Sequence, residues 1–530
     1  PWLGHEGRAW GAWDFHRLLA GGFLSPEGWP RSLPPGVAAL ETFVLTDQPP
    51  EATALAGTYL LRWEGTAEVS VGGLARDATR EGARAIRFAF RPGAGSVAIA
   101  VRALDPADPL RAMTLVREDR LDAFEAGATF DPDFLARIAP FRALRFMDWM
   151  DTNGSDQTAW DDRPRLSDAT WAWRGVPVEV IAHLADRAGA DPWFTLPHGA
   201  DDAYVTAFAT LVRDRLDPRL RVQAEWSNEV WNWIMPQAAW ARDRALERWG
   251  EDAPDDAWMQ FAGLRAAEVA DLWAAAFAAE PSRLVRVVAV HTGWPGLEDA
   301  LLDAPLAVAE GRPPPSESFD AYAVTGYFGF AAAGEDRAAA LMREARDGTA
   351  AESLAALSRA DIAALAGDLW PRHARAAARR GLRLIAYEGG PHIVPEGPAA
   401  EDPATLDALA AFAHGPEMAA LTAELLAAWR AAGGTLFMPF VDTAPPSRWG
   451  AWGALRFPGD WNPRWQALLD ANARPPWWDD GRDPAAFADG AWAEGTDGPD
   501  ALTGTPEEDV LLGAAGDDRL DGGGGSDLLH

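Results

Sequence analysis

The sequence contains no cysteine, and this absence excludes disulfide bonds, zinc–thiolate sites and cysteine nucleophiles. It contains no apolar run of the roughly 18 residues that a membrane-spanning helix needs, so we expect no membrane insertion. Basic residues are scarce, because 47 Lys and Arg stand against 79 Asp and Glu and leave a net charge of -32. Nucleic acid and anionic membrane surfaces both require a basic face, so neither is a predicted partner. The N-terminal stretch PWLGHEGRAW also lacks the basic-then-apolar pattern of a secretion signal.

The sequence has instead a globular composition with an excess of tryptophan. Its 530 residues are too many for one ordinary core and predict two or three domains. Hydrophobic residues make up 48%, which excludes wholesale disorder. Tryptophan occurs 27 times and tyrosine only 5 times. The large rigid face of tryptophan suits stacking on sugar rings, although core packing explains many of these residues equally well.

The N-terminal region, residues 1–120, has the pattern of a β-sandwich. From about residue 40 to residue 118, short segments that alternate or run apolar are separated by Gly, Pro and Asp turns. Short strands at near-regular spacing favour a compact two-sheet fold. Such a domain could be a carbohydrate-binding module or a scaffold, and its few exposed aromatic residues favour the scaffold.

Residues 121–480 alternate between strands and helices, which places the fold in the α/β class and predicts a (β/α)₈ TIM barrel. Helical stretches repeat apolar residues at i, i+3 and i+4, as helices packed on a parallel sheet do. Eight strands close such a barrel, so the first is expected near the N-terminus before the sandwich or upstream of this sequence. The sandwich would then be an insertion after barrel strand one. Seven candidate strands are evident in the stretches FRALRFMDWM, DPWFTLPH, RLRVQAEWSNE, RLVRVVAVH, DAYAVTGYF, GLRLIAYEGG and GGTLFMPFVD.

After a linker at residues 481–494, residues 495–530 form four consecutive nonapeptides. The aspartates Asp500, Asp509, Asp518 and Asp527 recur nine residues apart, and leucines follow in step. Glycines allow tight turns, while the Asp carboxylates and turn carbonyls offer the hard oxygen ligands that calcium prefers. A flexible Gly/Asp-rich tail, the alternative, would not keep four periods in register. The first two units lack some of the glycines, so complete ion sites are expected in the last two.

These nonapeptides resemble the RTX repeat, G-G-x-G-x-D-x-U-x, which folds as a β-roll. The resemblance implies structural calcium held by the four aspartates. It also implies export by the type I secretion machinery, which reads an uncleaved C-terminal signal, and therefore an extracellular location. We expect this calcium to stabilise the C-terminal end without entering any chemistry.

Two predicted barrel strands end in glutamate. The fourth strand ends in WSNEVWN, which contains Glu229, and the seventh ends in YEGG, which contains Glu388. Because active sites of these barrels lie at the carboxyl ends of the strands, we expect both side chains to face each other across the mouth. Such a pair can hydrolyse a glycosidic bond, one as general acid/base and one as ionised nucleophile. Glu225 lies four residues before Glu229 on the same strand face, and a barrel-interior ion pair is its expected role.

This arrangement resembles the clan A glycoside hydrolases over residues 130–473. The resemblance implies that Glu229 is the acid/base, that Glu388 is the nucleophile and that Asn228 binds the sugar 2-hydroxyl. It implies a retaining mechanism, with carboxyl groups about 5–5.5 Å apart. It also implies that Arg145 pairs with the nucleophile and keeps it ionised, and that the Tyr327 hydroxyl lies against the nucleophile.

Other residues at the ends of predicted strands are candidate substrate ligands. Clan A enzymes usually carry a Trp at the end of strand eight, whereas residues 436–440 contain none, so Trp449 or Trp452 of the following loop is expected to substitute. His198 and His291 are candidates for binding hydroxyls or tuning a pKa, Asp148 for a sugar ligand, and Trp231 for a stacking platform. Core packing, a buried ion pair or a histidine satisfied by backbone is the alternative for each of them.

These features predict a secreted retaining glycoside hydrolase that cleaves a β-linked polysaccharide, cellulose-like or another β-glucan. The linkage is taken from the habit of the clan. The alternative is a catalytically silent carbohydrate-binding or adhesin-like RTX protein that keeps the barrel for recognition. No cofactor is expected to take part in catalysis, because the nine histidines show no H-x-x-x-H or clustered carboxylate spacing.

Overall fold

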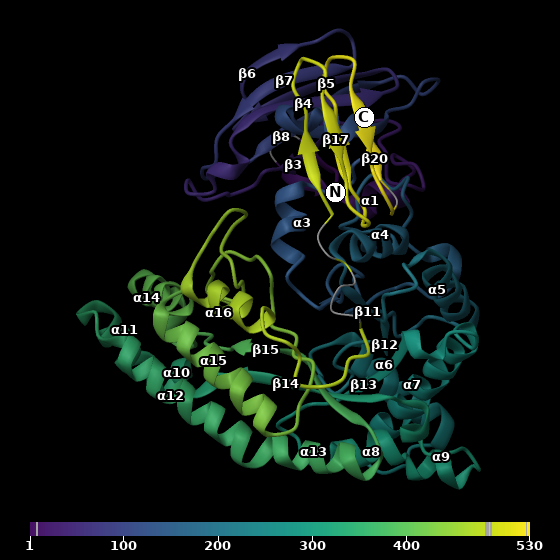
Figure 1. Cartoon of the computed structure of the whole chain (residues 1–530), viewed down its shortest axis with the longest axis vertical. Coiled ribbons are helices and arrows are strands. Elements are labelled where there is room, and N and C mark those ends of the chain that lie inside the picture. The colour runs from purple at the N-terminus through teal and green to yellow at the C-terminus, as the bar shows by residue number, and fades with distance from the viewer. Residues whose placement is uncertain (7–8, 483–486, 488–489, 526) are drawn as a thin grey trace.

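The computed structural model describes residues 1–6, 9–482, 487, 490–525 and 527–530, and its elements fall into three parts (Figure 1). Antiparallel strands form the N-terminal part, a parallel sheet with surrounding helices forms the middle, and short parallel strands form the C-terminal part. The C-terminal strands lie at the same end of the molecule as the N-terminal sheets (Figure 1). In the described residues, no helix has the length and apolar character that crossing a bilayer requires.

Two antiparallel sheets share one apolar core in the N-terminal part. Alternation along the strand of residues 85–90 buries Ile86, Phe88 and Phe90, which pack with Leu40 and Val101 of the other sheet. The region thus has the two sheets that its alternating segments predict. The first sheet has the order β2 (Ala9–Trp13), β1 (Leu3–Glu6), β3 (Val37–Val44), β8 (Val97–Leu104) and β5 (Ala67–Gly73), and the second has the order β6 (Arg76–Arg80), β7 (Ala85–Phe90), β4 (Gly57–Glu64) and β9 (Arg111–Arg117).

The two N-terminal strands correct one expectation about the barrel. β1 pairs antiparallel with β3, where Leu3 lies opposite Glu41, and with β2, where Gly4 lies opposite Trp13. The backbone groups of β1 and β2 therefore find their partners at an edge of the sandwich sheet, which removes these two strands from the barrel. The prediction that this segment supplies barrel strand one is wrong.

Six consecutive strands of the middle part pair in sequence order to form a parallel sheet. Residues 435–438 extend it beyond the last strand, because Thr435 N donates to Leu384 O and Met438 N donates to Ala386 O. Phe437 also forms a parallel bridge with Ala386. The seven segments predicted as strands therefore lie side by side in the predicted order, the last as a single bridge. The six strands are β10 (Ala143–Arg145), β11 (Asp191–Leu196), β12 (Val222–Trp226), β13 (Leu284–Ala289), β14 (Ala321–Phe328) and β15 (Arg383–Pro391).

Helices connect these strands, and their ends carry the expected signals. Asp201 caps a helix by accepting from Tyr204 N, and Gly189 ends another in the left-handed region at φ 59. Both faces of the sheet are buried, as in other parallel sheets. The helices are α1 (Phe15–Ala20), α2 (Leu121–Glu125) and α3 (Pro132–Ile138) before the sheet, then α4 (Val178–Ala188), α5 (Asp202–Arg215), α6 (Pro236–Trp249), α7 (Ala257–Ala276), α8 (Leu297–Asp303), α9 (Pro305–Ala309), α10 (Phe330–Ala333), α11 (Ala338–Asp347), α12 (Ala350–Ala364), α13 (Trp370–Arg379), α14 (Pro403–Ala413), α15 (Pro416–Ala431) and α16 (Pro463–Asn472).

A groove separates the two edges of the parallel sheet, β10 and residues 435–438. It holds a cavity of about 390 Å³, lined mainly by apolar side chains such as Phe141 of the loop before β10 and Trp465 of α16. Arg145 and Glu388 border the same cavity. Among the described residues the sheet is nearly closed but stays open at this groove, so the expected eight-stranded closure is not seen there.

The C-terminal part is a small β-roll. Its strands pair in parallel with residues 18 positions away, as Val510 does with Trp492 and Leu528, so one turn of the roll spans two nonapeptides. Val510 and Leu512 pack against Ala123 of α2. The strands are β16 (Trp492–Glu494), β18 (Val510–Leu512) and β20 (Leu528–Leu529) in one sheet and β17 (Ala501–Thr503) and β19 (Arg519–Asp521) in the other.

The roll is tied to the amino ends of the barrel strands. Glu507 accepts two hydrogen bonds from Arg219 at 3.0 and 2.9 Å, and Glu508 pairs with Arg187 at 3.4 Å. The ring of Phe487 lies beneath the Arg219 guanidinium. Residues 483–486 and 488–489 of the predicted linker lie outside the described residues, but Phe487 and Arg482 both contact the barrel. This docking side is opposite the carboxyl ends of the strands.

Candidate active site

Glu388 lies at the carboxyl end of β15 and is held by two hydrogen-bond donors. Arg145 Nη1 donates to its Oε1 at 2.7 Å, and the Tyr327 hydroxyl donates to its Oε2 at 2.8 Å. The side chain is buried, and burial raises the pKa of Glu388 to about 7, an effect that Arg145 opposes and that the nearby Glu229 reinforces. Glu388 therefore shares its site with a second carboxyl group and with one guanidinium.

Glu229 follows β12, and the donors to its carboxyl group among the described residues are neutral. Asn232 Nδ2 donates to Oε2 at 3.0 Å, and the Tyr387 hydroxyl donates to Oε1 at 3.2 Å. Burial raises the pKa of Glu229, and these two hydrogen bonds lower it in part. The backbone of Glu229 is in the left-handed region at φ 43, and that of Ser227 is at φ 60. The chain thus turns sharply at the strand end and directs Glu229 toward β15.

Arg145 joins the buried carboxyl groups. Its Nη2 donates to Glu225 Oε2 and to Asn228 Oδ1, each at 2.9 Å, while Nη1 binds Glu388. Trp193 Nε1 also donates to Glu225 at 2.8 Å. Glu225 thus forms the barrel-interior ion pair expected for it. We call Glu225, Glu229, Glu388 and Arg145 the carboxyl cluster, which holds three carboxyl groups against one guanidinium.

Asn228 is oriented by a network that the sequence did not reveal. Its buried side chain accepts from Arg145 and donates from Nδ2 to Asn153 Oδ1 at 3.1 Å. Gln237 Nε2 donates to the same Asn153 oxygen and to Asn228 O, each at 2.7 Å. Gln237 carries no motif that would single it out, because a polar residue in the first turn of a helix usually faces water.

The structure brings two further predicted residues, Trp452 and Asp148, to the surroundings of Glu388, and a third, Trp449, next to Trp452. Trp452 packs edge-on against Tyr327 with ring centroids 5.7 Å apart, so the loop after residues 435–438 supplies an aromatic side chain against the tyrosine that binds Glu388. The backbone carbonyl oxygen of Trp449 accepts a hydrogen bond from Trp452 Nε1 at 2.7 Å, and the Trp449 ring is exposed. Asp148 borders the 390 Å³ cavity with Glu388, and its charge helps to raise the pKa of that residue.

The two predicted histidines differ in their surroundings. His291 packs against Trp231 with ring centroids 4.3 Å apart, on neighbouring loops after β13 and β12. His198 packs against Trp240 of α6, and its backbone oxygen accepts from Trp226 Nε1 at 3.3 Å. Burial lowers the pKa of both histidines and favours the neutral ring. No contact in the described residues joins His198 to the glutamates, so its place in the site stays a prediction.

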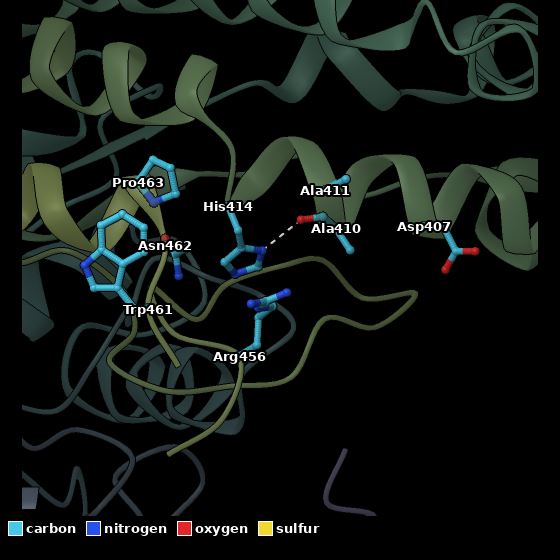
Figure 2. A pocket seen from close by; sticks show the side chains of 8 residues that line it. All are labelled: Asp407, Ala410, Ala411, His414, Arg456, Trp461, Asn462 and Pro463. Carbon is cyan, nitrogen blue, oxygen red and sulfur yellow. Dashed lines mark hydrogen bonds between the residues drawn. The ribbon is translucent and has the colours of Figure 1, made fainter. Parts of the chain in front are cut away.

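A second cavity, of about 430 Å³, is lined by residues outside the carboxyl cluster, and Figure 2 shows this lining. It is bordered by α14, which carries Asp407, and by the loop that carries Arg456 and Trp461. His414, at the end of α14, bonds through its two ring nitrogens to Ala410 O and to Gly453 O. Through His414, this cavity borders the loop that carries Trp452, whereas Glu388 lines the groove described above.

The β-roll gathers oxygen atoms around its glycines. A Cβ atom added at Gly504 would lie 2.1 Å from Asp509 Oδ2 and 2.5 Å from Gly522 O, and one added at Gly495 would lie 2.8 Å from Asp500 Oδ2. Carboxylate and carbonyl oxygens thus converge where a side chain would otherwise stand. Such cradles fit calcium, which takes six to eight oxygen ligands.

Comparison with known proteins identifies one part of the chain. Residues 494–529 match the family model of the RTX calcium-binding nonapeptide repeat, in four copies. A search of curated proteins gave no match. Among solved structures, the chain is similar to a 4-O-α-L-rhamnosyl-β-D-glucuronidase from Fusarium oxysporum 12S, with 12% identity, a TM-score of 0.37, and 63% of this chain and 69% of that chain covered. It is also similar to a modular endo-β-1,4-mannanase of glycoside hydrolase family 26 from Cellulomonas fimi, with 11% identity, a TM-score of 0.32, and 67% and 77% covered.

The C-terminal repeats are therefore RTX repeats that bind structural calcium, as their spacing predicted. Because the roll docks at the amino ends of the barrel strands, chelation of calcium is expected to unfold the roll and leave turnover essentially unchanged. Asp518→Asn should weaken calcium binding, whereas the same change at its exposed neighbour, Asp517→Asn, should not. Calorimetric unfolding with and without chelator, paired with an activity assay, measures both effects. Complete loss of activity while the barrel stays folded would contradict this expectation.

Proposed function

We propose that the chain is an extracellular retaining glycoside hydrolase of the clan A type, in which Glu388 is the nucleophile and Glu229 the acid/base. The observation that carries the proposal is the unequal surroundings of the two carboxyl groups. Glu388 accepts from the Arg145 guanidinium, which favours its ionised form, whereas the donors to Glu229 in the described part of the chain, Asn232 and Tyr387, are neutral. The excess of acidic groups in the carboxyl cluster favours retention of one proton, and these contacts support its assignment to Glu229.

Two displacements account for hydrolysis with this pair. In the first, a Glu388 oxygen attacks the anomeric carbon while Glu229 gives its proton to the glycosidic oxygen, so the glycosidic C–O bond breaks and a glycosyl ester forms. In the second, Glu229 takes a proton from water, the water oxygen attacks the same carbon, and the ester C–O bond breaks. Two inversions at one carbon return the original configuration. Asn228, held by Arg145 and Asn153, is assigned to the sugar 2-hydroxyl.

Exposed tryptophans at the mouth support a polysaccharide as substrate. Trp149, Trp233, Trp294 and Trp449 lie on loops after β10, β12, β13 and residues 435–438, and all four are exposed. Trp231, two residues after Glu229, packs against His291 of the loop after β13. His291 Nδ1 is buried and has no hydrogen-bond partner among the described residues. Flat aromatic faces in series suit successive sugar rings. We assign a β-linked polysaccharide, such as a β-glucan, as the substrate. Export by the type I secretion machinery would bring the enzyme to this substrate outside the cell.

A screen for reducing-sugar release over a panel of polysaccharides tests this proposal. Wild type should release sugar from at least one member, and Glu229→Gln and Glu388→Gln should both fail to do so. Glu247→Gln, on the exposed face of α6, is the matched control and should act as wild type. Binding without release by wild type would instead favour a carbohydrate-binding protein without catalytic function. Release that is unchanged in both variants would reject the two glutamates as the catalytic pair.

A further inference from the structure

We propose that Tyr387 is a positioning residue that holds the acid/base Glu229 in register with the nucleophile Glu388. This assignment rests on the function proposed above. Tyr387 directly precedes Glu388 and is fully buried. Its hydroxyl reaches Glu229 and its ring faces Arg145, so one side chain touches the acid/base and the guanidinium that binds the nucleophile.

A β-bulge is what makes this contact possible. Along the β14–β15 pair, Val324 lies opposite Ala386 and Thr325 lies opposite Glu388, so Tyr387 is the extra residue. In a regular strand, neighbouring side chains point to opposite faces. The bulge changes this direction locally. Tyr387 therefore packs with Trp193 inside the barrel while Glu388 also meets Arg145.

The hydroxyl of Tyr387 completes the hydrogen bonding of Glu229. It donates to Oε1 while Asn232 donates to Oε2, so both carboxyl oxygens have a donor. Burial and the adjacent carboxyl groups raise the pKa of Tyr387 well above its ordinary value, so the hydroxyl keeps its proton and remains a donor. This hydrogen bond strengthens as Glu229 gives its proton to the glycosidic oxygen, because a charged acceptor binds a donor more tightly than a neutral one. Tyr387 thus stabilises the charge that develops in the first step.

The ring of Tyr387 has a separate role. The Arg145 guanidinium lies 5.1 Å from the Tyr387 ring and 5.4 Å from the Trp193 ring. These two aromatic groups hold the guanidinium that binds Glu388. Replacing Tyr387 by phenylalanine keeps this packing and removes only the hydroxyl, which isolates the contact with Glu229.

The charged and titratable groups around Glu229 come from four strands. They are Arg145 of β10, Glu225 of β12, Tyr327 of β14, and Tyr387 and Glu388 of β15. Tyr387→Phe leaves every one of these charges in place. A change in the ionisation of Glu229 in this variant is therefore assigned to the lost hydrogen bond.

The test is the pH dependence of kcat/KM for Tyr387→Phe on two substrates of the same sugar. One is the natural glycoside, and the other is an aryl glycoside whose activated leaving group needs no proton. The first step requires protonated Glu229, so activity on the natural glycoside is lost as pH rises through its pKa. The hydroxyl lowers that pKa, so its removal should move the basic limb to higher pH. We expect kcat/KM on the natural glycoside to fall about tenfold at the optimum, and that on the aryl glycoside to stay near wild type.

Tyr322→Phe is the matched control. Tyr322, on β14, is fully buried like Tyr387, and its hydroxyl forms a hydrogen bond with His373 Nδ1 at 2.8 Å, away from the glutamates. This control should leave the basic limb in place. Equal slowing of both substrates by Tyr387→Phe, or an unmoved basic limb, would overturn the assignment. Glu229→Gln and Glu388→Gln in the same assay separate the two failures. If both glutamine variants retain wild-type rates, the proposed function is rejected together with the role of Tyr387. If both are inactive and Tyr387→Phe gives one of these contrary results, only the role of Tyr387 is rejected.

Discussion

Glutamine at position 388 is expected to abolish hydrolysis of every glycoside that the wild-type enzyme accepts. The amide that replaces the carboxylate is no nucleophile, so no glycosyl ester can form, and we expect kcat to fall more than about 10³-fold. Glutamine is nearly isosteric, its oxygen can still accept from Arg145, and its amide N–H can donate to the Tyr327 hydroxyl oxygen, so the fold should persist. Initial rates on a natural glycoside and on an activated aryl glycoside measure the loss.

Glu229→Gln separates the two glutamates by chemistry. It removes the proton donor, so we expect a fall of about 10²–10⁴-fold on the natural glycoside. An activated leaving group needs no proton, so formation of the glycosyl ester from an aryl glycoside should be little affected. Glu388→Gln should lose both substrates. The reverse pattern, with the aryl glycoside retained only by Glu388→Gln, would exchange the two roles.

Replacing Arg145 by glutamine is expected to affect both stability and activity. It leaves Glu225 and Glu388 buried without a cation, and breaking a buried ion pair in this way costs about 3–5 kcal/mol. The pKa of Glu388, already raised by burial, should rise further once the guanidinium is gone. Because an ionised nucleophile is required, the acidic limb of the pH–rate profile should move to higher pH. Urea unfolding and kcat/KM against pH measure these effects.

The pH dependence of this stability loss has a definite sign. A buried carboxyl group whose pKa is raised above its unfolded value contributes stability while it is protonated, and that stability is lost as pH rises toward the folded-state pKa. For Glu388 the window extends from its unfolded value to about 7 in the wild type and should extend higher in Arg145→Gln. The variant should therefore be least impaired at acidic pH. The half-exposed pair of Arg286 with Asp320 offers a control, and Arg286→Gln should shift no limb. An unmoved acidic limb in Arg145→Gln would contradict the role given to Arg145.

Strand order and strand ends could be predicted from the sequence. The apolar segments were long enough, and the helices between them periodic enough, to place Glu229 and Glu388 at the same end of a parallel sheet. Arg145 and Tyr327 were expected at other strand ends, and the structure brings both to Glu388. These inferences succeed because parallel strands present their carboxyl ends at one edge. The aspartates of the repeats were equally accessible to prediction, because a nine-residue period is visible without any tertiary information.

Contacts that depend on register were beyond prediction. Strand alternation would point Tyr387 away from Glu388, and the bulge that reverses this arises from the pairing of β14 with β15. Asn153 and Gln237 meet Asn228 from two separate loops, so no local pattern marks them. The sequence of the N-terminal strands fits a barrel strand as well as a sandwich strand, and the pairing of β1 with β3 decides between the two folds.

The measurement that tests the central claim most directly is covalent trapping of the nucleophile. A 2-fluoro glycoside of the released sugar, with a good leaving group, slows the second displacement and lets the glycosyl ester accumulate. Mass spectrometry of the intact protein should then show one added glycosyl group, and peptide mapping should place it on Glu388. Glu388→Gln should remain unlabelled. A label on another residue, or continued hydrolysis by an enzyme that never becomes labelled, would contradict the two-glutamate mechanism.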